Sequence, residues 1–81
     1  MKASVEISMY PLDTPYVPPI LDFINRLNEY KDLKVNTNSM STQVFGEYDR
    51  IMEALTKEMK TSFEQNPSVV MVIKVINMEL G

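Results

Sequence analysis

The reactive side chains of this sequence are carboxylates, lysines, tyrosines and hydroxyls, because its 81 residues include neither cysteine nor histidine. Thiolate and imidazole nucleophiles are therefore missing, together with the usual ligands of zinc and haem. Glu47 and Asp49 stand two positions apart at the start of an expected helix, where acidic groups interact favourably with the helix dipole. We interpret them as dipole partners rather than an acid–base pair, and we expect no catalytic residue, metal or cofactor.

Polar and aromatic side chains recur at two places that the pattern below puts on one face of a sheet. A few convergent polar groups among aromatic rings suit a flat, polar heterocycle. The alternative is an ordinary solvated sheet face, which commonly carries serine, asparagine and glutamine. The residues concerned are Ser8, Tyr10, Asn36, Asn38, Gln43 and Phe45.

Charge and hydropathy exclude several classes of partner. The formal net charge is −3 and no run of lysine and arginine occurs, which argues against nucleic acid as a partner. The longest apolar run, residues 69–73, is far too short to span a membrane. Residues 1–4 lack the apolar segment of a signal peptide. We therefore expect a cytoplasmic protein with no membrane partner.

The spacing of apolar residues predicts the elements that position these side chains. Strict alternation over residues 2–10 predicts a half-buried strand, and spacings of three and four after Pro18 and Pro19 predict an amphipathic helix. A polar turn separates two further short strands, a second helix follows, and a β-branched strand comes last. The predicted strands cover residues 2–10, 33–40, 43–45 and 69–78, and the predicted helices cover residues 17–30 and 47–65.

This order predicts one α+β domain over residues 1–81 with the ferredoxin-like βαββαβ arrangement. Two right-handed crossovers place both helices on one face of a four-stranded antiparallel sheet, with the first and third strands central. Arg26 and Arg50 both fall on the helices, so the chain lacks the arginine loop with which acylphosphatase, an enzyme of this fold, holds phosphate. Fold alone supplies no chemistry, and we do not expect an enzyme.

The last strand is apolar on both sides, although a free antiparallel sheet face is normally polar. Lys74 assigns the outer face, so Val69, Met71, Ile73 and Val75 are expected in the core. An apolar patch on an edge strand usually marks a partner surface, and we expect a homo-oligomer, a dimer or a tetramer. The alternative is that single exposed valines are simply tolerated. The residues of the expected interface are Val70, Val72, Ile76 and Met78.

Two segments carry a family resemblance. Residues 5–12, which read VEISMYPL, resemble the opening "isvyPl" of the small thiamine-binding, YkoF-like domains. Residues 38–49, which read NSMSTQVFGEYD, resemble the signature "nsmsT-x-v-x-G-x-x-d" of the same family. The resemblance implies a ferredoxin-like fold, face-to-face assembly, and an association with thiamine or its hydroxymethylpyrimidine moiety.

The resemblance also implies a ligand site on the first strand and the hairpin. In this interpretation Tyr10 or Phe45 stacks on a ring of the ligand, and hydroxyl and amide groups bond the pyrimidine nitrogens. Glu47 or Glu6 offsets the thiazolium charge, by an attraction that strengthens in a shielded site. The residues assigned to ligand binding are Ser8, Tyr10, Asn38, Met40, Thr42, Phe45 and Glu47.

Two functions remain open from the sequence. The first is non-enzymatic binding of thiamine or a related hydroxymethylpyrimidine compound, at the sheet face or subunit interface of a homo-oligomer. The alternative is an oligomeric interaction or regulatory module that has no small-molecule ligand.

Overall fold

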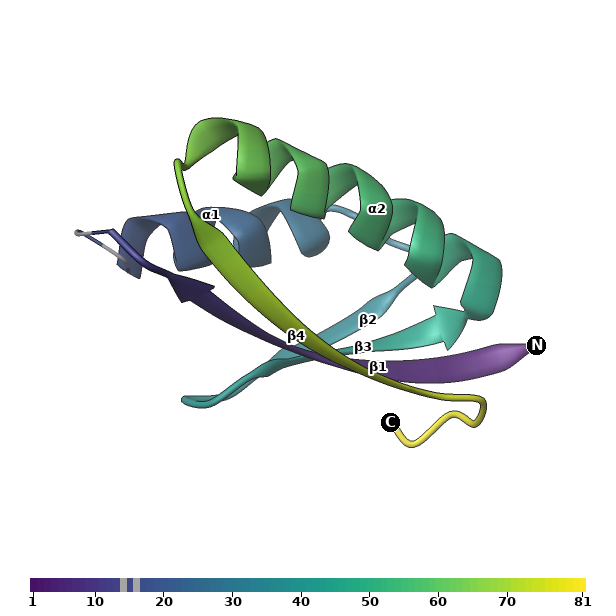
Figure 1. The fold of residues 1–81 in the computed structure, drawn as a ribbon. Helices are drawn as coiled ribbons and strands as arrows, with labels where there is room; N and C mark the ends of the chain where they lie inside the picture. The colour runs from purple at the N-terminus through teal and green to yellow at the C-terminus, as the bar shows by residue number, and fades with distance from the viewer. Residues whose placement is uncertain (14, 16) are drawn as a thin grey trace.

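The computed structural model describes residues 1–13, 15 and 17–81. One sheet has the strand order β2-β3-β1-β4, with every neighbouring pair antiparallel, and both helices lie on the same face of it (Figure 1). This confirms the predicted ferredoxin-like α+β fold. The elements in chain order are β1 (Lys2–Pro11), α1 (Val17–Leu27), β2 (Lys34–Thr37), β3 (Thr42–Glu47), α2 (Tyr48–Gln65) and β4 (Val69–Ile76).

Three elements end earlier than their patterns predict. Helix α1 ends at Leu27, because the next residues form hydrogen bonds that span three residues instead of four. One of them joins Tyr30 N–H to the Leu27 carbonyl oxygen at 3.1 Å. Strand β2 keeps only the first half of its predicted range, since the chain turns at Asn38. Strand β4 ends at Ile76, where the chain bends away.

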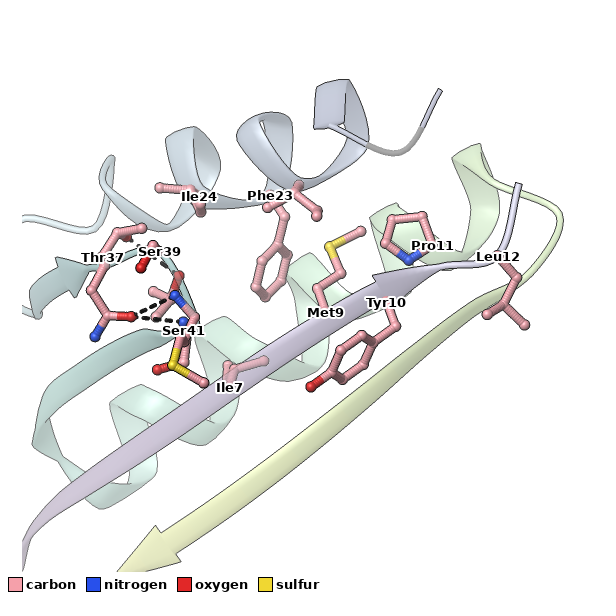
Figure 2. A pocket seen from close by; sticks show the side chains of 14 residues that line it. Ile7, Met9, Tyr10, Pro11, Leu12, Phe23, Ile24, Thr37, Ser39 and Ser41 are labelled. Atoms are coloured by element: carbon pink, nitrogen blue, oxygen red, sulfur yellow. Dashed lines mark hydrogen bonds between the residues drawn. The ribbon is translucent and has the colours of Figure 1, made fainter. Parts of the chain in front are cut away.

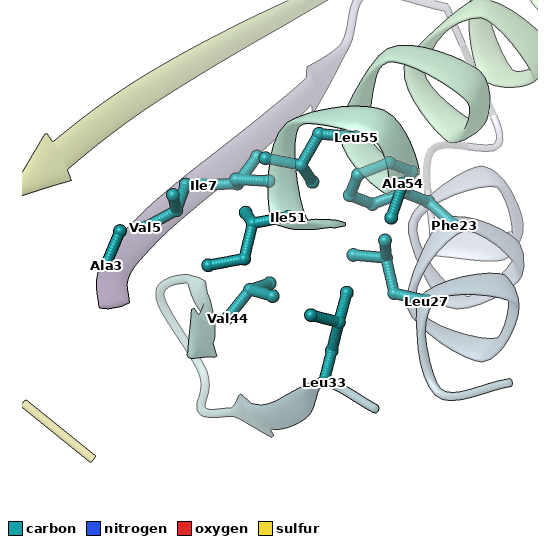
Figure 3. Packing of buried hydrophobic residues seen from close by; sticks show 10 residues of the cluster. All are labelled: Ala3, Val5, Ile7, Phe23, Leu27, Leu33, Val44, Ile51, Ala54 and Leu55. Carbon is teal, nitrogen blue, oxygen red and sulfur yellow. The ribbon is translucent and has the colours of Figure 1, made fainter. Parts of the chain in front are cut away.

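The core lies between the sheet and the two helices (Figure 3). Alternate residues of β1 point into it, as the period of two predicts, and meet residues of α2 at helical spacing. Full burial of each aliphatic side chain contributes about 1.5–3 kcal/mol. The cluster consists of Ala3, Val5, Ile7, Phe23, Leu27, Leu33, Val44, Ile51, Ala54 and Leu55.

Met71 and Ile73 are partly buried against this core, but Val69 and Val75, which alternation along the last strand also predicts to be buried, do not belong to it. Val75 is the more exposed of the two. Its side chain is 49% exposed. Strand β4 is an edge strand that twists away from α2 along its length (Figure 1), so its last residues extend beyond the helical layer. Alternation along the strand therefore predicts the correct face of the sheet for Val75, but neither helix covers its side chain on that face.

Helices α1 and α2 are joined by a partly buried polar network. Arg26 Nη1 donates to Glu58 Oε1 at 2.7 Å, Arg26 Nη2 donates to Ser62 Oγ at 2.6 Å, and Tyr30 Oη donates to Glu58 Oε2 at 2.6 Å. Burial acts to raise the pKa of Glu58, but the bonds from Tyr30 and Arg26 outweigh it and the pKa lies below its ordinary value. The native network therefore holds a charged carboxylate.

Gly46 lets β3 pass directly into α2. Its φ of +155° lies in the region that favours glycine. A Cβ atom at this position would lie 2.9 Å from Leu33 Cδ2, so the missing side chain also makes room for the core.

We predict that Arg26→Ala lowers the free energy of unfolding by about 3 kcal/mol, because it leaves the buried Glu58 carboxylate without its cationic partner. The matched control is Arg50→Ala, whose ion pair with Asp32 lies at the surface and contributes less than about 1 kcal/mol. Urea unfolding at pH 7 measures both values. Equal losses in the two variants would contradict the role given to the network.

The same network predicts a pH dependence. The hydrogen bond to Glu58, assisted by burial, raises the pKa of Tyr30 to about 12, against an unfolded value of about 10. Because the pKa of Tyr30 is higher in the folded state, its protonated hydroxyl stabilises that state at every pH below the unfolded-state pKa. This stabilisation is lost as the pH rises from about 10 to about 12. We expect Tyr30→Phe to be less stable than the parent protein at pH 8, with the difference shrinking above pH 10 in urea titrations. A difference that stays constant up to pH 12 would refute this assignment.

Candidate functional site

A cavity of about 470 Å³ opens between the end of β1, helix α1 and the β2–β3 hairpin (Figure 2). Apolar side chains from β1 and α1 form one part of its wall, and hydroxyl and amide groups of the hairpin form the other. An apolar hollow with a few polar groups at one side is typical of sites for small organic ligands. The lining residues are Ile7, Met9, Tyr10, Pro11, Leu12, Ile20, Phe23, Ile24, Thr37, Asn38, Ser39, Met40, Ser41 and Thr42.

Asn38 shapes the hairpin that forms the polar wall. Its Oδ1 accepts from Met40 N–H at 2.8 Å and from Ser41 N–H at 2.9 Å, an arrangement in which an asparagine side chain mimics a backbone turn. The tight turn leaves the Met40 side chain 85% exposed at the tip. Asn38 lines the cavity, and its Nδ2 group forms no hydrogen bond with the described residues.

The cavity brings together part of the predicted ligand set. Tyr10, Asn38, Met40 and Thr42 all line it. The Thr42 side chain is buried, with its Oγ1 3.3 Å from Thr37 Oγ1. Ser8 lies nearby but outside the lining, with its Oγ 3.5 Å from the Met40 carbonyl oxygen.

Phe45 and Glu47 are not brought to the cavity. Phe45 lies on the sheet face away from the helices and is only 5% exposed. Glu47 ends β3 beside the start of β1, where its carboxylate pairs with the Met1 ammonium at 3.0 Å and with Lys2 at 3.6 Å. A hydrogen bond from that ammonium, assisted by its charge, lowers the pKa of Glu47.

Glu6 is the carboxylate that contacts the hairpin. Ser41 Oγ donates to its Oε2 at 3.0 Å, and Lys74 Nζ lies 3.4 Å from its Oε1. The hydrogen bond from Ser41, followed by that from Lys74, lowers the pKa of Glu6. Glu6 and Lys74 are also cross-strand partners in the register of β1 and β4.

Sequence reasoning missed the apolar wall. The spacing of Ile20, Phe23 and Ile24 is that of any core-facing helix stripe, so periodicity does not distinguish a cavity wall from a packed core. Ser39 and Ser41 belong to the polar turn that the sequence predicts between the second and third strands. The available signal was the polar character of residues 38–42, since a hairpin that short and polar cannot fill the space beside α1.

The outer sheet face, opposite the helices, carries three of the four expected apolar residues, and the fourth, Met78, follows the end of β4. Val70, Val72, Ile76 and Met78 are 42–53% exposed, and the strand register places Tyr10 beside Val70. We call Tyr10, Val70, Val72 and Ile76 the outer patch.

Fold and cavity together define a small α+β domain with a hollow suited to an organic ligand. The thiamine-binding protein family matches residues 5–78, and the chain belongs to this family. This confirms the resemblance carried by the first strand and the hairpin. No curated protein matches the chain with statistical significance.

Solved structures share the fold over nearly the whole chain. Protein SP2199 from Streptococcus pneumoniae has a TM-score of 0.89 at 22% identity, covering 99% of this chain and 90% of its own. A proposed thiamine biosynthesis/salvage protein from Thermotoga maritima has a TM-score of 0.86 at 18% identity, covering 96% and 85%. A hypothetical protein from Methanocaldococcus jannascii has a TM-score of 0.82 at 28% identity, covering 99% and 84%.

Two further observations concern the described residues alone. Neither described helix is both long and apolar enough to cross a membrane. Within residues 1–13, 15 and 17–81, no three aspartate or glutamate side chains form a cluster that could bind a metal ion.

Proposed function

We propose that this protein binds thiamine or a related hydroxymethylpyrimidine compound in the cavity beside the hairpin, without catalysing a reaction. The observation that carries the proposal is that Tyr10, Asn38, Met40 and Thr42 surround one cavity in a member of the thiamine-binding protein family. The cavity, at about 470 Å³, lies within the usual range for small-molecule sites.

The chemistry of the wall fits an aminopyrimidine. Asn38 Nδ2 donates to a ring nitrogen of the ligand, while the apolar side chains of Ile20, Ile24 and Met9 contact the flat faces of the ring. The ring of Tyr10 points to the outer side of β1, away from Met9 and Phe23 (Figure 2), so we do not assign it to stacking in the cavity. Asn38 thus has two functions, because its carbonyl oxygen holds the turn and its amide group meets the ligand.

A thiazolium ring needs a counter-charge rather than a hydrogen-bond donor. Glu6 supplies it from the outer side of the hairpin, one hydrogen bond away from the cavity through Ser41. Because its pKa is lowered, this carboxylate stays charged well below neutral pH. Glu47, which the resemblance also suggested for this role, is already paired at the other end of β3.

The outer patch is the surface through which we propose self-association, in a cytoplasmic dimer or tetramer. Burying one valine or isoleucine contributes about 1.5–3 kcal/mol, which a small domain gains by pairing. The Glu6–Lys74 pair lies between Val72 and Ile76 and is neutral overall. Across a two-fold axis the lysine of one copy faces the glutamate of the other, so the face is complementary to itself.

An interaction module without a ligand is the second candidate, and the exposed apolar side of β4 favours it. Ligand titration distinguishes the two functions, because only the first predicts heat on adding a pyrimidine compound. Self-association is common to both.

Calorimetry with hydroxymethylpyrimidine, which is neutral at pH 7, tests the ligand and the role of Asn38. We expect Asn38→Asp to weaken binding about tenfold, because it keeps the oxygen that holds the turn but removes the Nδ2 donor. The matched control is Asn36→Asp, which adds the same charge at an exposed position outside the cavity and should bind as the parent protein does. Absence of heat with either hydroxymethylpyrimidine or thiamine at millimolar concentration would overturn the proposed ligand.

Sedimentation equilibrium tests the outer patch. Val72→Glu places like charges opposite each other across a two-fold interface, and we expect it to weaken self-association about a hundredfold. Leu21→Glu is the matched control, because Leu21 is 53% exposed on α1, outside the patch and the cavity. The proposed interface fails if Leu21→Glu is the more disruptive of the two variants.

A further inference from the structure

Residues 77–81 fold back over the outer face of the sheet after β4 ends (Figure 1). We call them the returning segment. Ser4, on β1, holds the segment by a single hydroxyl. Its Oγ donates to the Met78 carbonyl oxygen at 2.7 Å and accepts from Leu80 N–H at 2.8 Å.

The end of the returning segment lies against Phe45. A Cβ atom added to Gly81 would lie 2.6 Å from Phe45 Cδ2 and Cε2, so no larger side chain fits there without displacement. The segment explains why Phe45 and Ser4 are each only 5% exposed on a face that the helices do not cover. Farther along the same face, Tyr10 and Val72 remain 52% and 49% exposed.

This contact is weaker than the packing on the helical face. Met78 and Leu80 are 53% and 65% exposed, so their side chains bury little surface against the sheet. A hollow of about 350 Å³, lined by Phe45, Ile76 and Leu80 among others, remains beside the segment. Both polar bonds depend on one hydroxyl, so one local change releases them together.

We propose that the returning segment is a displaceable strap that limits self-association through the outer face. The proposal rests on the proposed self-association of the outer patch. With the segment in place, a second copy meets only the part of the face around Tyr10 and Val72. When the segment leaves Ser4, the side chain of Phe45 joins the outer patch and the larger apolar surface accepts the second copy.

Release of the strap affects the dimer dissociation constant twice, once for each copy. The apparent affinity of a protein falls with the fraction of molecules in the binding-competent state. Both copies of a symmetric pair must release their segments, so the dimer dissociation constant varies inversely with the square of that fraction while the fraction is small. Removing two hydrogen bonds of ordinary net strength raises the open fraction about tenfold, and the dissociation constant then falls about a hundredfold.

Two variants release the strap by different routes. Ser4→Ala removes both hydrogen bonds, and Gly81→Leu pushes the segment away from Phe45 by steric conflict. We expect each to speed hydrogen exchange at the Leu80 amide about tenfold, and to lower the dimer dissociation constant about a hundredfold in sedimentation experiments. Ser8→Ala removes a hydroxyl from the same face of β1 without touching the segment, so Leu80 exchange should stay unchanged.

The outcomes separate the strap from the interface. Suppose that Val72→Glu weakens self-association but Ser4→Ala and Gly81→Leu do not strengthen it; the strap alone is then overturned. Unchanged self-association in these two variants would mean that the segment has no role in assembly, and weakened self-association would make it part of the interface. If the parent protein and both strap variants remain monomeric at millimolar concentration, the proposed self-association is itself overturned, and the strap with it. An unchanged rate of hydrogen exchange at the Leu80 amide in Ser4→Ala would refute the role of Ser4 in holding the segment.

Discussion

Two helices cover only one face of a four-stranded sheet, and the functional surfaces of this protein follow from that constraint. The covered face holds the core, built on alternate residues of β1, and it leaves a cavity where the short β2–β3 hairpin fails to fill the space beside α1. The uncovered face carries the apolar residues of β4, and the returning segment shields part of it. One face thus holds the site proposed for a small molecule, and the other holds the surface proposed for a second chain.

The cavity and the outer face are linked through the hairpin. Ser41 lines the cavity and donates to Glu6, which in turn pairs with Lys74 in the middle of the outer face. A ligand that moves Ser41 therefore acts on a charge pair that a second copy would meet. The two proposed activities of the protein share this short chain of polar contacts.

The fold could be predicted because apolar residues recur with a period of two in β1 and β4 and at spacings of three and four in both helices. The order of these elements along the chain, with right-handed crossovers, then determines the topology. The exposure of Val70 and Val72 followed from the same alternation. What covers the outer face could not be predicted. The returning segment has no periodicity, and its place depends on a bond between Ser4 and Met78, which are 74 positions apart. Hence Phe45 was assigned the correct face, while its burial under residues 77–81 was missed.

The polar network between α1 and α2 has a consequence for the resting state of the cavity. Apolar contacts are nearly indifferent to sliding, whereas the guanidinium of Arg26 on α1 reaches Glu58 and Ser62 on α2 in directions that permit one alignment of the two helices. A shift of one helix past the other by a turn would break these bonds. Phe23 and Ile24, within one turn of Arg26, are therefore held at a fixed height above the sheet. The hollow is pre-organised, and a compound that enters it meets walls already in place.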